Sequence, residues 1–68
     1  MFNKVFDKAY SEGQKRLADS YEATASLHRA TLKLPGLTPR TVDWLRGQAA
    51  YCSQVATCAR ERAVQGHP

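Results

Sequence analysis

Two stripes at helical spacing run side by side along the last third of the chain. The first stripe is small and apolar, and consists of Leu45, Ala49, Cys52, Ala56, Ala59 and Ala63. The second stripe is shifted by one residue toward the N-terminus, and consists of Trp44, Gln48, Tyr51, Val55, Cys58 and Arg62. On a helix that turns about 100° per residue, the two stripes lie roughly 100° apart. A helix with two such stripes is expected to contact two neighbours rather than one.

The first half of the chain also predicts a helix, from about residue 3 to residue 33. Asn3 can cap its start, and oppositely charged side chains stand at i,i+4 spacing along it. A stripe of apolar residues, diluted by polar ones in its middle, is expected to face the second helix. This stripe consists of Phe6, Tyr10, Gly13, Leu17, Tyr21, Thr24, Leu27, His28, Thr31 and Leu34.

Residues 34–38 predict a turn between the two helices. Pro35 disfavours a helical Leu34, and Pro35-Gly36 fits the two central positions of a type II turn. Thr38 is then the expected N-cap of a second helix, with Pro39 at its first position. This helix should run from about residue 39 to residue 64 and end near Gly66. The chain is therefore expected to form one all-α domain over residues 1–68, an antiparallel two-helix hairpin.

The position of the turn also predicts which residues face each other. With the turn centred near Gly36, facing residues have numbers that add to about 72, which sets Leu27 opposite Leu45 and Gly13 opposite Ala59. The alanine stripe with a glycine opposite it indicates a close approach of the helices.

A lone hairpin of 68 residues leaves part of this apolar surface uncovered. Dimerisation into a four-helix bundle would cover it, and so would a host or cognate protein partner. A partner-binding surface is expected from Trp44, Tyr51, Val55 and Arg62. Phe2 and Phe6 are expected to project past the end of the second helix and to complete either that surface or the dimer. The alternative for Trp44 and Tyr51 is that they are core residues of the bundle.

Catalytic chemistry finds little support in this chain, which we expect not to be an enzyme and to need no metal or cofactor. On one helix, Cys52 and Cys58 lie about 9 Å apart along the axis, beyond the roughly 7 Å that a disulfide allows. Both are expected to be buried reduced thiols of a cytoplasmic protein. They also point in different directions, which excludes a shared metal site with His67. No secretory signal and no membrane-spanning stretch are visible.

The turn region predicts an alternative function, binding of RNA or a nucleotide. No acidic residue lies between Glu22 and Asp43, while Arg29, Lys33 and Arg40 all fall there. Together with the N-terminus of the second helix, these cations could hold a phosphate. The same charges also suit a solvated turn and the C-terminal dipole of the first helix.

The segment Val42-Asp43-Trp44-Leu45, followed by an alanine-rich helix through Arg60-Glu61-Arg62-Ala63, resembles small phage-encoded helical-hairpin proteins. Members of that group inhibit host regulators, including a quorum-sensing receptor. The likeness covers about a third of the chain and implies no particular functional residue. It favours a non-enzymatic module that binds and modulates a partner protein, of which a phage or mobile-element inhibitor of a host regulator is one form.

Overall fold

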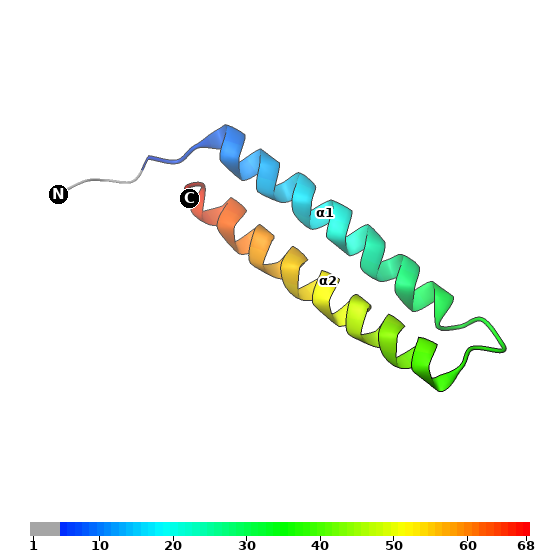
Figure 1. Ribbon diagram of the computed structural model, residues 1–68. Helices are drawn as coiled ribbons and strands as arrows, with labels where there is room; N and C mark the ends of the chain where they lie inside the picture. The colour runs from blue at the N-terminus through cyan, green and yellow to red at the C-terminus, as the bar shows by residue number, and fades with distance from the viewer. Residues whose placement is uncertain (1–4) are drawn as a thin grey trace.

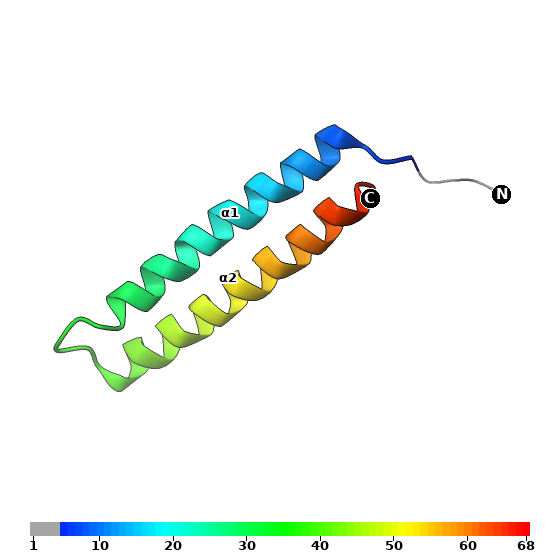
Figure 2. The same ribbon diagram turned by 180° about the vertical axis from the view of Figure 1, so that it is seen from behind.

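The computed structural model describes residues 5–68 and confirms the predicted all-α hairpin. Helix α1 spans Lys8–Thr31 and helix α2 spans Pro39–Gln65, and the two run antiparallel along their whole length (Figures 1 and 2). The Cα atoms extend over 58, 18 and 10 Å along the three principal axes of the molecule. The described chain is therefore a slab one helix thick. Its core can therefore lie only in the line between the two helices, and both broad faces of the slab are open.

The ends of α2 follow the prediction. The Thr38 hydroxyl accepts a hydrogen bond from the Thr41 amide at 3.2 Å, with Pro39 behind it at the first helical position. Gly36 has φ of 79° and Gly66 has φ of 74°, the left-handed conformation that favours glycine. These local signals fix where α2 begins and ends.

The start of α1 differs from the prediction. The helix begins at Lys8, and Asp7 caps it by accepting a 3.0 Å hydrogen bond from the Tyr10 amide. Asn3, the expected cap, lies outside the described residues. A carboxylate at the cap also interacts favourably with the helix dipole, which gives Asp7 an advantage over a neutral side chain. The Asp7 amide donates to the carbonyl of Gly66, so this segment crosses the end of α2.

The inner surface of α1 is also different from the predicted stripe. Ser11, Ala18 and Ala25 are buried at seven-residue spacing. Gln14, Tyr21, His28 and the C-cap residue Leu32 are half-buried and continue the same line along the helix. We call these seven residues the inner seam of α1. Leu17 and Leu27, which the predicted stripe contained, are 38% and 65% exposed. Small side chains in the seam let the backbones approach closely, and the larger leucines are left on a neighbouring surface.

The inner seam of α2 is the one predicted, since Leu45, Ala49, Cys52, Ala56, Ala59 and Ala63 are all buried. Ala18, Ala56 and Ala59 form the centre of the core, with Tyr21 packed against them. No large side chain in residues 5–68 is fully buried. The hairpin is therefore held by a close but thin contact.

Contacts across the hairpin confirm the predicted register. The rings of Tyr21 and Tyr51 lie 6.4 Å apart, those of His28 and Trp44 lie 5.7 Å apart, and both pairs have numbers that add to 72. The predicted pairings of Leu27 and Gly13 are wrong, because neither residue lies in the seam. A Cβ placed on Gly13 would have no neighbour within 4 Å.

Candidate functional site

The two inner seams divide the slab into two broad faces of different chemistry. The first, which we call the charged face, contains on α1 Lys8, Glu12, Lys15, Asp19, Glu22, Ser26 and Arg29, and on α2 Asp43, Arg46, Ala50, Ser53, Thr57, Arg60 and Val64. The second, which we call the aromatic face, contains on α1 Tyr10, Gly13, Leu17, Ser20, Thr24, Leu27 and Thr31, and on α2 Thr41, Trp44, Gln48, Tyr51, Val55, Cys58, Arg62 and Gln65. These sets follow from the 3.6-residue period once the buried residues are known.

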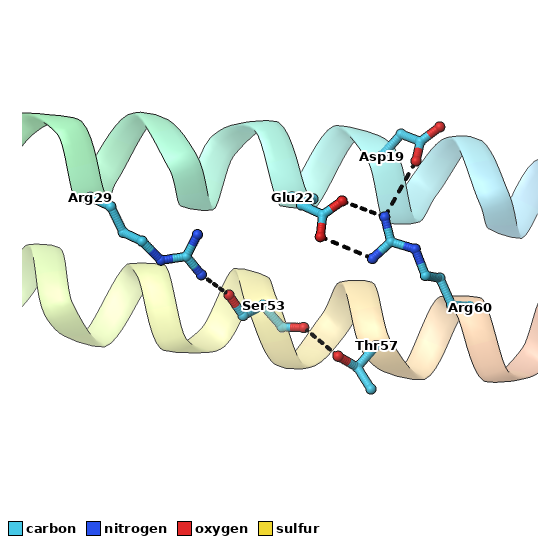
Figure 3. Close-up of polar contacts among 6 residues, drawn as sticks. All are labelled: Asp19, Glu22, Arg29, Ser53, Thr57 and Arg60. Carbon is cyan, nitrogen blue, oxygen red and sulfur yellow. Dashed lines mark hydrogen bonds and ion pairs between the residues drawn. The ribbon is translucent and has the colours of Figure 1, made fainter.

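Polar bonds join the two helices across the charged face. Arg60 of α2 reaches both Glu22 and Asp19 of α1, the latter at 3.4 Å, and Arg29 of α1 donates to the hydroxyl of Ser53 (Figure 3). All of these groups are largely exposed, so the bonds set register more than they add stability. Arg29 and Arg60 are thus both engaged by the opposite helix.

The Arg60–Glu22 pair shifts the protonation of both groups. The Arg60 guanidinium lowers the pKa of Glu22 below its ordinary value, first through its hydrogen bond and then through its positive charge. The same hydrogen bond raises the pKa of Arg60. The ion pair therefore favours the ionised form of Glu22.

The aromatic face carries almost no charge. Arg62 is the one charged residue in the set, and its guanidinium Nε donates a 3.1 Å hydrogen bond to Gln14. None of the six acidic residues of the chain belongs to this face. The aromatic face is thus poor in charge, while Arg16, Arg40 and Glu61 belong to neither face.

Large apolar side chains on the aromatic face are open to solvent. Trp44 is 57% exposed and Tyr51 is 56% exposed, even though each lies edge-on against a ring of α1. Leu17 and Leu27 stand beside them on α1 and are also exposed. The ring contacts hold Trp44 and Tyr51 in place without covering them. The hairpin therefore leaves these four large side chains open to solvent, on a face whose other residues are mostly small or uncharged and polar.

The structure brings together four of the residues predicted from the second stripe, Trp44, Tyr51, Val55 and Arg62, on this face. Phe6 is placed elsewhere. A Cβ built on Gly66 would lie 1.8 Å from the Phe6 ring, so one side of this ring lies against the end of α2, while Phe6 remains 55% exposed. Phe2 lies outside the described residues.

Sequence reasoning missed the contribution of α1 to this surface. Leu17 and Leu27 were assigned to the hairpin core, and Gly13 was placed there with them. The signal that could have found them is the second set of small residues in α1, Ser11, Ala18 and Ala25, at strict seven-residue spacing. Those small residues pack against the alanine seam of α2, and Leu17 and Leu27 are therefore left on the exposed surface.

The three cations predicted to bind phosphate lie around the turn, in different surroundings. Arg29 is bound to Ser53 on the charged face, and Lys33 and Arg40 lie on either side of the turn, both exposed. The Thr38 hydroxyl caps the first turn of α2 itself.

Other features of the described residues offer little chemistry. A shallow groove of about 530 Å³ lies near the two ends of the chain, lined by Phe6, Ser11, Lys15, Asp19, Arg60, Ala63 and Val64.

Both cysteines are free thiols. Cys52 is buried as predicted, whereas Cys58 is exposed, because it belongs to the aromatic face and not to the seam.

Within residues 5–68, His, Cys, Asp and Glu side chains form no group of three that could hold a metal ion. Neither helix of the described part is long and apolar enough to cross a membrane. Comparison with known protein families, with curated proteins and with solved structures finds no match to this chain. The aromatic face is accordingly the strongest candidate site.

Proposed function

We propose that this chain is a non-enzymatic protein-binding module, and that the aromatic face docks against helices of a partner protein. One observation carries the proposal: Leu17, Leu27, Trp44 and Tyr51 are exposed together on a face whose single charge is Arg62. Large apolar side chains gathered on one exposed face are typical of an interaction surface, and aromatic residues and arginine are enriched in interfaces.

The size of the face fits a stable protein–protein contact. A 27-residue helix is about 40 Å long, and two packed helices are about 20 Å wide. The face therefore covers about 800 Å², which is the area that each partner contributes to an interface of standard size. Trp, Tyr and Arg are the residue types that carry most binding energy in such interfaces.

The proposal agrees with the class of protein that the Asp43-Trp44-Leu45 segment resembles. Leu45 is buried in the seam, Asp43 lies on the charged face and Trp44 lies on the aromatic face. Trp44 is therefore the residue of this segment that a partner can reach. Inhibition of a host regulator through this surface is the form of modulation that the resemblance favours.

Affinity capture with matched variants tests the proposal. Tagged wild-type protein, Trp44→Ala, Tyr51→Ala and the charged-face control Thr57→Ala are each incubated with cell lysate, and bound material is quantified by mass spectrometry. We expect a protein partner, or the chain itself, to be retained by wild type and Thr57→Ala and lost in the two aromatic variants. Equal retention by all four proteins would contradict the proposal.

The same samples test binding of nucleic acid. Material that contains RNA or a nucleotide, is lost in the Arg29→Ala, Lys33→Ala double variant, and is kept by the aromatic variants would also overturn the assignment. Such binding would weaken with added salt, because it depends on phosphate charge.

A further inference from the structure

Charge is distributed unevenly along the length of the hairpin. The half that contains the turn, residues 23–50, carries Asp43 as its single carboxylate, and we call it the turn half. It carries four cationic side chains, so its formal charge is +3, from Arg29, Lys33, Arg40 and Arg46 against that carboxylate. The rest of the described chain, residues 5–22 and 51–68, carries five positive and five negative side chains and is neutral. The excess positive charge of the described residues therefore lies in the turn half.

The aromatic face is also most open in the turn half. Leu27 and Trp44 are both more than half exposed there, and Tyr51 follows directly after it along α2. On the same face, Leu17 in the other half is less exposed than any of these three. Leu34 is exposed at the turn itself. Apolar side chains and positive charge therefore come together at one end of the hairpin.

The cations nearest the turn have no carboxylate partner in the hairpin. The ion pairs within residues 5–68 all involve Arg60, so neither Lys33 nor Arg40 is paired. Asp43 follows Arg40 by three residues but forms no ion pair with it. Arg40 precedes Trp44 by four residues on α2, and residues at this spacing are neighbours on a helix surface. An unpaired cation therefore lies beside the exposed tryptophan.

We propose that the turn half of the aromatic face binds an acidic amphipathic helix of a partner protein. The apolar stripe of that helix contacts Leu27 and Trp44, and its carboxylates lie beside Arg40 and Lys33. This inference rests on the proposed function, because it names the chemistry of the partner that docks there. The part of α2 from Pro39 to Tyr51 is about 20 Å long, so three to four turns of a partner helix span it.

The exposed side chains favour a protein over a nucleic acid as this partner. Leu27 and Leu34 are aliphatic and offer no ring on which a base could stack. The Trp44 ring is already in contact with the ring of His28. An apolar helix stripe, in contrast, buries leucine and tryptophan side chains alike.

Charge selects among protein partners. The aromatic face carries no carboxylate, so a basic helix would meet no opposite charge on it and would be repelled by the turn half. An acidic helix is attracted to the same end, which raises its association rate and aligns its carboxylates with the turn. Because the cations are exposed, this attraction is screened by salt.

A displayed library of helical peptides tests the inference. Every peptide keeps leucines at helical spacing along one stripe, and the flanking positions are randomised among Glu, Gln and Lys. We expect peptides selected on the wild-type protein to be enriched in Glu over Lys, and to bind Trp44→Ala at least about tenfold more weakly. Selected peptides with no excess of Glu, or with an excess of Lys, would overturn the inference.

Matched charge variants locate the attraction. The Lys33→Gln, Arg40→Gln double variant removes two positive charges from the turn half, and Lys8→Gln with Lys15→Gln removes two from the other half. At low salt we expect the first to weaken a selected acidic peptide about tenfold, and the second to stay within about twofold of wild type. The difference should shrink in high salt. Circular dichroism checks that both variants remain helical, and equal effects of the two would contradict the assigned place of binding.

The two proposals fail in different ways. Selected peptides that need Trp44 but show no preference for Glu would overturn the acidic-helix inference and leave the docking function standing. A library that gives no Trp44-dependent peptide would count against both. An RNA oligonucleotide or an anionic vesicle that outcompetes the selected peptides, through Lys33 and Arg40 and regardless of Trp44, would also overturn the inference.

Discussion

The hydroxyl of Ser11, near the start of α1, donates a 2.7 Å hydrogen bond to the backbone carbonyl of Ala63, near the end of α2, and the contact is buried. The last carbonyls of a helix have no partner within the helix. Ser11 therefore supplies the partner of a buried acceptor and fixes the spacing of the two helices at this end.

We expect Ser11→Ala to destabilise the hairpin by about 1–2 kcal/mol, because the Ala63 carbonyl is then buried without its partner. Urea unfolding at a fixed protein concentration measures the change. Ser26→Ala removes a hydroxyl from an exposed position of the same helix and should stay within about 0.5 kcal/mol of wild type. Equal effects of the two substitutions would show that the bond contributes nothing.

Close approach of the helices depends on Ala18 having a small side chain. Ala18→Leu is expected to lower the free energy of unfolding by about 1–3 kcal/mol, because the seam has no room for the added atoms. Ala23→Leu makes the same change on the exposed side of α1 and should be close to neutral. Thermal unfolding of the two variants compares them directly, and an Ala18→Leu protein as stable as wild type would be inconsistent with a tight seam.

Two glycines are expected to respond to alanine in opposite ways. Gly36→Ala should destabilise by about 1 kcal/mol, because its φ of 79° is strained for any residue with a Cβ. Gly47 lies inside α2 with nothing within 4 Å of an added Cβ, and Gly47→Ala should stabilise by about 1 kcal/mol. Urea midpoints that move in the same direction would contradict the turn geometry.

The Arg60–Glu22 pair predicts a pH dependence with a definite sign. Because the pKa of Glu22 is lower in the folded than in the unfolded state, ionised Glu22 stabilises the hairpin above its unfolded pKa. This contribution is lost as the pH falls through the folded pKa. Carboxyl NMR titration should give a Glu22 pKa below the ordinary range in wild type, and a higher one in Arg60→Ala. Added salt should also raise it, since the pair is exposed.

The elements that sequence could predict are those set by local signals. Thr38, Pro39 and Gly66 define the ends of α2 through capping chemistry that acts within a few residues. The α2 seam could be predicted because its small apolar residues recur at alternating intervals of four and three residues, the spacing of a packed helix face. The inner surface of α1 could not, because Leu17 and Leu27 carry more apolar area than Ser11, Ala18 and Ala25, and only the close fit of the opposite helix decides between them.

The sequence predicted the α2 residues of the candidate site but not those of α1, for the same reason. Trp44, Tyr51 and Val55 were predicted because α2 carries a second stripe that the hairpin contact does not use. Their neighbours on α1 were assigned to the core. Phe6 precedes the N-cap Asp7 and is therefore not part of α1, and its ring lies against Gly66. Contacts between the two ends of the chain leave no periodic signal in a sequence.

Trp44 is the one tryptophan of the chain, so its fluorescence reports directly on the aromatic face. In the hairpin alone this side chain is 57% exposed. As the occupant of the face is added, whether a captured partner or more of the chain itself, the emission should shift to shorter wavelength and acrylamide quenching should fall. An emission maximum and quenching constant that stay unchanged over the whole range, with partner and without, would contradict docking through this face.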